Sequence, residues 1–124
     1  MWWLRRRLSE TTVHRADAAI ALGRGYSLSP ELAVEGISEH LERVALTAGA
    51  MISTLDGLVK APVPVGPGQT FRLEAFDVPA VWTVVRDGEG VILSGDRRAE
   101  ATAALRGPAV DLLLGVTRRR VFAD

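Results

Sequence analysis

The sequence predicts an α+β protein in which helices cover one face of an antiparallel sheet. Two observations support this class: the first half has apolar residues at helical spacing, whereas the second half has short segments rich in β-branched residues. A hydrophobic fraction of 48% and a charged fraction of 24% over 124 residues suit a globular domain with a buried core.

The first helix is predicted over residues 2–22 and ends at the glycine that follows, Gly23. Leu4 and Leu8 recur on one face at helical spacing. The helix starts with two tryptophans directly after Met1, without a capping residue. Because nothing upstream covers this apolar start, we expect a chain truncated at its N-terminus.

The second helix is predicted to begin with Ser29 as N-cap and Pro30 in the first helical position. The pattern extends towards Gly57, with a break at Gly49. The apolar stripe of this helix consists of Val34, Ile37, Leu41, Val44 and Ala48. The polar residues outside that stripe are Glu39, His40, Glu42 and Arg43.

Residues 60–69 contain three prolines and two glycines and are predicted to be a linker. The strands that follow are predicted at 70–76, 81–86, 91–94 and 100–105, with a hairpin turn at 87–90 and a short apolar helix at 109–114. The aromatic residues of these strands, Phe71, Phe76 and Trp82, are predicted to pack in the core.

Charge and composition exclude several classes of partner. The formal net charge is zero, which argues against a nucleic-acid-binding surface, and there is no cysteine for a disulfide or a thiolate metal site. No apolar segment has the length of a membrane span, and the charges near the start follow the apolar residues instead of preceding them as in a secretory signal. We therefore expect a cytoplasmic protein with no membrane partner.

Glu10, His14 and Asp17 are predicted to project from one side of the first helix, within roughly 60° at about 100° per residue. A carboxylate and an imidazole at this spacing can bind one divalent ion, and a nearby Asp can orient the histidine from a second shell. The spacing is also that of an ordinary surface pair, and Asp17 could pair with an arginine such as Arg24. His40 is predicted to be solvated.

Two stretches of the sequence, residues 3–45 and 70–118, resemble the mycothiol-dependent maleylpyruvate isomerase family. The family pattern HE-x-x-x-H-x-x-D-A-x-x-A-x-G is matched from Glu10 to Gly23, and P-x-L-A-x-D-G-x-x-E is matched at 30–39 except for its Asp. Residues 70–118, with Trp82 and RGPAVDLLLGVTR, resemble the family's C-terminal α/β domain. The sequence departs from the family at Ser9, where a histidine is usual, and at Val116-Thr117 in a WGR-like ending.

The resemblance implies two domains. Residues 1–24 would be the last helix of a truncated DinB-like four-helix bundle, and residues 25–124 a small domain with sterol-carrier-like topology. It implies that Glu10 and His14 are zinc ligands, that Asp17 lies in the second shell, and that a third ligand, a histidine, lies upstream. Nickel, iron and manganese suit the same two donors. Mycothiol would be the thiol cosubstrate, and Arg118 would bind an anionic group of substrate or cofactor, although a solvated basic tail, with Arg119 and Arg120, is the alternative.

We therefore expect a fragment of a metal- and mycothiol-dependent isomerase or thiol transferase that acts on a small electrophilic substrate such as maleylpyruvate. The fragment should be inactive alone, because it lacks the upstream histidine. Its first helix should be covered by the missing bundle or by a partner chain, and a homodimer could supply further ligands by symmetry. Two alternatives are a non-enzymatic sterol-carrier-like binding module and an interaction module that docks on a separate partner.

Overall fold

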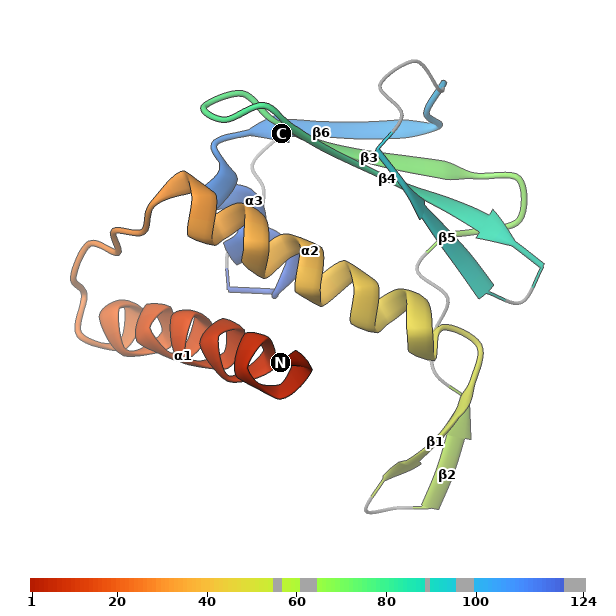
Figure 1. Ribbon diagram of the computed structural model, residues 1–124, viewed down its shortest axis with the longest axis horizontal. Coiled ribbons are helices and arrows are strands. Elements are labelled where there is room, and N and C mark those ends of the chain that lie inside the picture. The colour runs from red at the N-terminus through yellow and green to blue at the C-terminus, as the bar shows by residue number, and fades with distance from the viewer. Residues whose placement is uncertain (55–56, 61–64, 89, 96–99, 120–124) are drawn as a thin grey trace. The chain divides into compact units, whose positions relative to one another are not determined.

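The structure is a computed structural model that describes residues 1–54, 57–60, 65–88, 90–95 and 100–119 (Figure 1). Its α+β class confirms the prediction. None of the helices in these described ranges is long and apolar enough to cross a membrane. The elements follow in the order α1 (Trp2–Ala21), α2 (Pro30–Thr47), β1 (Met51–Thr54), β2 (Gly57–Lys60), β3 (Thr70–Ala75), β4 (Ala80–Asp87), β5 (Gly90–Ser94), β6 (Ala103–Gly107) and α3 (Ala109–Val116).

Helix α1 ends as predicted, within one residue, because Gly23 adopts a left-handed conformation with φ of 63°. The N–H of Gly23 donates to the carbonyl of Ile20 at 3.0 Å, and the N–H of Arg24 donates to that of Ala19 at 2.8 Å. These two bonds form a Schellman motif, in which glycine at the left-handed position carries no Cβ penalty. No side chain caps the start of α1.

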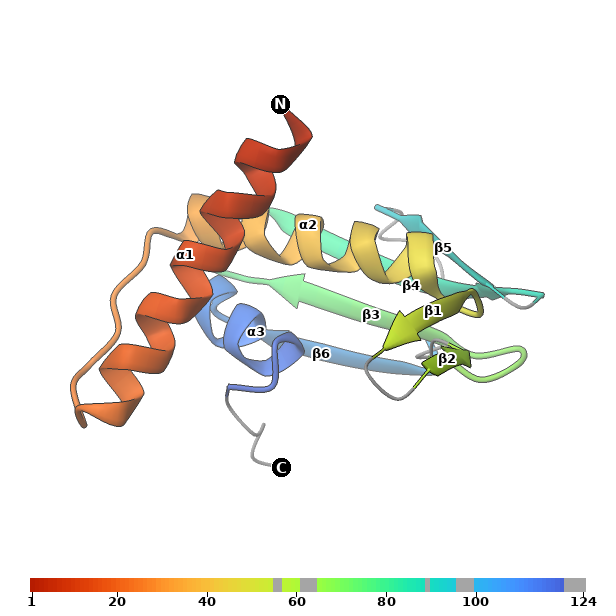
Figure 2. The same ribbon diagram turned by 90° about the horizontal axis from the view of Figure 1, so that it is seen from below.

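Helix α2 begins as predicted, since the Oγ of Ser29 accepts a hydrogen bond from the N–H of Leu32 at 3.3 Å. The predicted extension towards Gly57 is wrong. Gly49, with φ of 75°, follows the helix, and the next residues form the antiparallel hairpin β1–β2 instead (Figure 2). The segment Met-Ile-Ser-Thr at 51–54 favours a strand because of its β-branched residues.

The main sheet has the strand order β5-β4-β3-β6 and is mixed, so the prediction of an antiparallel sheet is corrected. β4 and β5 are antiparallel, with Val84 opposite Leu93. β6 lies next to β3 instead of β5, as the bond from the N–H of Thr102 to the carbonyl of Thr70 at 2.8 Å indicates. Because β6 returns across the sheet, β3 gains a neighbour on each side, and the sequence alone does not encode that order.

The predicted linker begins within β2, which includes Lys60. Residues 61–64 of that prediction lie outside the described residues. In the described part, 65–69, the segment has no helix or strand, as its prolines and glycines predict. Within it, the side-chain oxygen of Gln69 accepts a hydrogen bond from the N–H of Gly66 at 3.0 Å, which stabilises the turn into β3.

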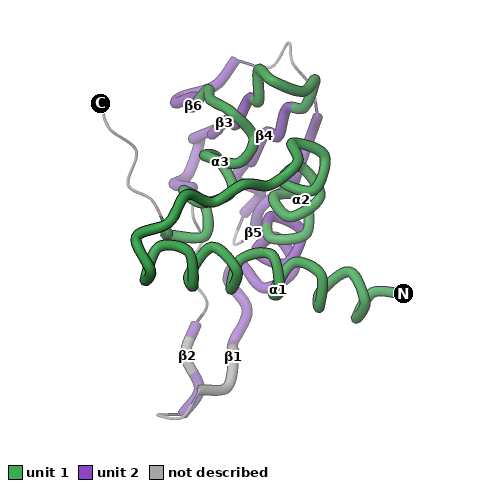
Figure 3. Tube along the Cα trace, turned by 90° about the vertical axis from the view of Figure 1, so that its left-hand side faces the viewer, with its two compact units in different colours: residues 1–40, 75–80, 106–124 green, residues 41–74, 81–105 purple. Residues whose placement is uncertain are grey.

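The chain divides into two compact units, coloured separately in Figure 3. Unit 1 consists of residues 1–40, 75–80 and 106–124, and unit 2 of residues 41–74 and 81–105. Unit 1 contains α1, most of α2 and all of α3, and its buried apolar residues are Ala16, Ala33, Ile37, Ala75, Ala109, Leu112, Leu113 and Leu114. Unit 2 contains most of the strands, and its buried apolar residues are Leu41, Val65, Leu73, Trp82 and Val84.

The aromatic predictions have different outcomes. Trp82 is buried in β4, which confirms it as a core residue, and Phe71 is half-buried. The prediction for Phe76 is wrong, because this side chain is exposed. β3 ends one residue earlier, at Ala75, and the guanidinium of Arg106 lies over the Phe76 ring at 5.9 Å from its centre.

Candidate functional site

The face of α1 that is buried within unit 1 consists of small residues: Ser9, Thr12 and Ala16. Their spacing of three and four places them on one side of the helix. The hydroxyl of Tyr26 donates to the carbonyl of Thr12 at 2.7 Å, so the chain after α1 folds back onto this side. Ser9, which stands where the resembling family has a histidine, is therefore turned towards the interior and is 6% exposed.

Two arginines join α1 to α2. Arg5 forms an ion pair with Glu35, and Arg6 donates from Nη1 to Glu39 at 3.1 and 3.4 Å. Glu39 is only 4% exposed, although it lies outside the apolar stripe of α2. The reason is tertiary: α1 lies beside this part of α2 (Figures 1 and 2), and the arginine compensates the buried carboxylate.

Glu10, the first predicted ligand, is half-buried on α1. Its carboxylate lies 3.0 Å from Nη2 of Arg6 and 3.5 Å from Nη1 of Arg7. Glu10 therefore belongs to the same ion-pair network as Glu39. A divalent ion at Glu10 would have to compete with two guanidinium groups for its oxygens.

His14, the second predicted ligand, is hydrogen-bonded to Asp17. Its Nδ1 lies 3.1 Å from Oδ2 of Asp17, while 70% of the His14 side chain is exposed. Because Nδ1 is engaged with a carboxylate, Nε2 is the nitrogen that remains for another partner. Metal-bound histidines commonly have this carboxylate contact on the other ring nitrogen.

Asp17 also receives two hydrogen bonds from Arg119, 102 residues later in the sequence. Nε donates to Oδ1 at 2.9 Å and Nη2 donates to Oδ2 at 3.1 Å. These bonds from Arg119, followed by those from His14, hold the pKa of Asp17 below its usual value, although burial opposes this effect. The same pairing raises the pKa of Arg119.

The partner of Asp17 differs from the expectations. The sequence predicts that Arg119 is solvated, and it offers Arg24 as an arginine with which Asp17 could pair. The observed partner is Arg119, which is half-buried. Arg120 lies outside the described residues.

Arg118, the predicted anion-binding residue, is exposed and follows α3 with a left-handed φ of 62°. Its N–H donates to the carbonyl of Gly115 at 2.9 Å, and the N–H of Arg119 donates to that of Leu114 at 2.7 Å. These bonds form a second Schellman motif. The turn that Arg118 makes directs Arg119 back to α1. The anion-binding role of Arg118 stays a prediction.

The ligand atoms on α1 are of the right kind for a divalent cation, but there are too few of them. A carboxylate and an imidazole with an oriented ring suit zinc, yet a catalytic zinc site takes about three protein ligands. Within the described residues, no group of three or more His, Cys, Asp or Glu side chains could hold a metal ion. His40, the only other histidine, is half-buried on α2. The ligand roles of Glu10 and His14 thus stay predictions.

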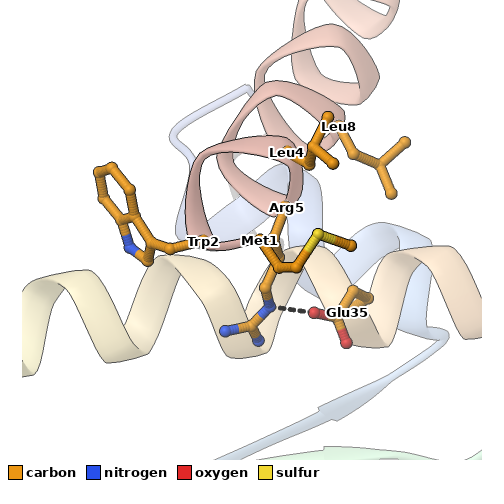
Figure 4. Close-up of a pocket in the computed structure, with 6 residues that line it drawn as sticks. All are labelled: Met1, Trp2, Leu4, Arg5, Leu8 and Glu35. Atoms are coloured by element: carbon orange, nitrogen blue, oxygen red, sulfur yellow. Dashed lines mark hydrogen bonds and ion pairs between the residues drawn. The ribbon is translucent and has the colours of Figure 1, made fainter.

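The start of α1 carries a second feature, an open apolar hollow of about 540 Å³ (Figure 4). Trp2 and Trp3 nearby are 67% and 61% exposed. Exposed apolar residues clustered in this way mark interaction surfaces in soluble proteins. The residues that line the hollow are Met1, Trp2, Leu4, Arg5, Leu8 and Glu35.

Comparisons of this chain with protein-family models, with curated proteins and with solved structures found no match.

Proposed function

We propose that this chain contributes part of a divalent-metal site, with Glu10 and His14 as ligands, to an isomerase or thiol transferase of the mycothiol-dependent maleylpyruvate isomerase type. The single observation that supports it best is the contact between His14 Nδ1 and Asp17 Oδ2 at 3.1 Å. That contact leaves Nε2 of this largely exposed side chain for a metal, as in many metal-bound histidines. In this proposal α1 is the last helix of a DinB-like bundle, and residues 25–124 form the α/β domain.

The exposed apolar surface at the start of α1 supports a division of the site between segments. A two-ligand site needs at least one further ligand, and we propose a histidine from a helical segment packed on this surface, in the same polypeptide or in a partner chain. Met1, Leu4 and Leu8 would provide the apolar contact for it. A second copy of this chain is the other source of ligands.

A divalent cation held here would favour the thiolate form of a cosubstrate such as mycothiol, for attack on a small electrophile such as maleylpyruvate. The chain's own residues would hold the cation and orient the groups around it. Asp17 would orient the His14 ring, and Arg118 would bind an anionic group of the substrate or cofactor. By itself, the chain should be inactive because its ligand set is incomplete.

The proposal is tested by zinc titration of the purified chain and three variants, monitored by calorimetry. We expect weak binding that His14→Gln weakens by about tenfold or more, and Glu10→Gln likewise, because each removes a ligand. His40→Gln is the matched control, and it should bind zinc within about twofold of the wild type. Equal zinc binding by the wild type and the two ligand variants would contradict the proposal.

The inactivity of the isolated chain needs a separate measurement. The chain should show no turnover of a thiol adduct when zinc, a mycothiol analogue and maleylpyruvate are supplied. Tight zinc binding together with turnover would show that the ligand set is complete in this chain, and would overturn the proposal that a further segment supplies a ligand.

The second candidate function is a non-enzymatic module in one of two forms. One is an interaction module that docks on a partner through the open apolar hollow on α1, which this hollow favours. The other is a sterol-carrier-like module, in which residues 25–124 hold an apolar ligand. Titration with a fluorescent lipid probe distinguishes the two forms of this candidate. Saturable binding that Leu8→Gln leaves unchanged would support the sterol-carrier-like form, whereas binding that Leu8→Gln abolishes would support apolar docking at the hollow. A chain that stays monomeric and binds no apolar probe would count against both forms.

A further inference from the structure

The guanidinium of Arg119 donates to three oxygens, which distinguishes it from a solvated residue in a basic tail. In addition to both oxygens of Asp17, its Nη1 donates to the carbonyl of Thr117 at 2.6 Å. The Schellman motif at the end of α3 sets the direction of the residue. α3 itself is anchored by Leu112, Leu113 and Leu114, all buried. The guanidinium is therefore held by the core of unit 1.

Asp17 by itself would be a weakly held carboxylate. Its side chain is 40% exposed, and a pair three residues apart on an exposed helix surface contributes little order. A bidentate guanidinium fixes the plane of a carboxylate as well as its position. Oδ2, which accepts from Arg119 Nη2 at 3.1 Å, is also the oxygen that contacts His14 Nδ1.

The contact with Asp17 decides which His14 nitrogen carries the proton. An ionised carboxylate can only accept hydrogen bonds, and an aspartate that accepts two bonds from a guanidinium, as Asp17 does from Arg119, is ionised at neutral pH. Nδ1 of His14 must therefore be the donor. The neutral ring then has its lone pair on Nε2, the nitrogen that is free to bind a cation.

We propose that Arg119 is a positioning residue, which clamps Asp17 so that His14 is held in the Nδ1–H tautomer with Nε2 available for a ligand. The relevance of this tautomer to metal binding rests on the function proposed above. The tautomer itself does not, since it is a property of the metal-free chain. Arg119 touches neither substrate nor ligand in this role and acts only through Asp17.

The test is ¹⁵N NMR of the two imidazole nitrogens of His14 in the metal-free chain, at a pH of about 8.5, where imidazoles are neutral. In Arg119→Met, the ratio of the Nδ1–H to the Nε2–H form should fall by about threefold or more, because Asp17 loses its clamp. Arg119→Lys keeps the charge but cannot bind bidentately, so its tautomer ratio should lie between those of the wild type and Arg119→Met. Asp17→Asn should invert the ratio, because an amide can donate to Nδ1.

Arg24→Gln is the matched control. It removes a guanidinium charge near the end of α1, where Arg24 bonds through its backbone N–H to the carbonyl of Ala19, so the tautomer ratio should stay at the wild-type value. Thermal melts of each variant establish that it is folded. An unchanged ratio in folded Arg119→Met, or an equal change in Arg24→Gln, would overturn the inference.

Zinc titration of the same variants separates this inference from the proposed function. Zinc binding that Arg119→Met weakens by about tenfold supports both. A tautomer change in a chain that does not bind zinc leaves Arg119 as the positioning residue and contradicts the metal site. Zinc binding that needs His14 but does not change in Arg119→Met, with an unchanged tautomer, supports the metal site and contradicts the role of Arg119.

Discussion

Helices α3 and α1 of unit 1 use their apolar residues in opposite ways. α3 buries Ala109 and all three leucines at 112–114. α1 buries only Ser9, Thr12 and Ala16, and leaves its tryptophans and leucines exposed. Its links to the rest of unit 1 are polar: ion pairs to α2, the bond from Tyr26, and the clamp of Arg119 on Asp17.

The difference shows that position in the fold, more than composition, decides what a helix contributes. α3 stabilises unit 1 by removing apolar surface from water, which contributes about 25 cal/mol per Å². Apart from the pair of Arg6 with the buried Glu39, α1 is held by contacts that are partly exposed, so each of these contributes modestly. Its apolar side is exposed, and its polar side carries the candidate ligands Glu10 and His14.

The largest effect on stability is expected when a leucine is shortened to alanine, and it should differ between the two helices. Leu113→Ala on α3 should lower the free energy of unfolding by about 3 kcal/mol, because Leu113 is 1% exposed and packs against Gly36. Leu8→Ala on α1 should change it by less than about 0.5 kcal/mol. Urea denaturation followed by circular dichroism measures both. Similar losses for the two variants would mean that α1 is packed like α3.

A smaller effect is expected at the helix ends, where both helices have a left-handed residue: Gly23 after α1 and Arg118 after α3. Gly23→Ala should destabilise by about 1 kcal/mol, because a Cβ is disfavoured at this φ. Arg118→Gly should stabilise by about 0.5 kcal/mol for the converse reason. The thermal unfolding midpoints should therefore move in opposite directions. A fall in both would mean that the Arg118 side chain contributes more than its backbone strain costs.

The smallest effect is expected from pH, through Asp17. Because its pKa is lowered in the folded chain, chiefly by Arg119, its stabilising contribution is complete above about pH 4 and is lost as the pH falls through the folded-state value. The unfolding midpoints of wild type and Arg119→Met should therefore differ at pH 7 and converge at acidic pH, as the pH falls through the folded-state pKa of Asp17. A difference that persists at the lower pH would mean that Arg119 stabilises α1 by packing instead of charge.

The local elements could be predicted from the sequence because their signals are local. Ser29 and Pro30 start α2, Gly23 ends α1, and β-branched residues indicate β3 to β5, all within a residue or two. The predicted extension of α2 is wrong because Gly49, with its left-handed φ, follows the end of the helix instead of interrupting it. The last strand, β6, is predicted to follow β5 in an antiparallel meander, but in the sheet it lies next to β3. Its place could not be predicted because the order of strands depends on where a crossover returns.

The sequence by itself determined the class of the fold, the helix ends and the side of α1 on which Glu10, His14 and Asp17 project, because helical periodicity and capping depend on neighbouring residues alone. Only the tertiary structure decided which charges meet. Arg119 reaches Asp17 across 102 residues, and Glu39 is buried against Arg6. From the sequence alone, a basic segment and a polar helix face are expected to be solvated. They become part of the packed structure only when folding brings an opposite charge to them.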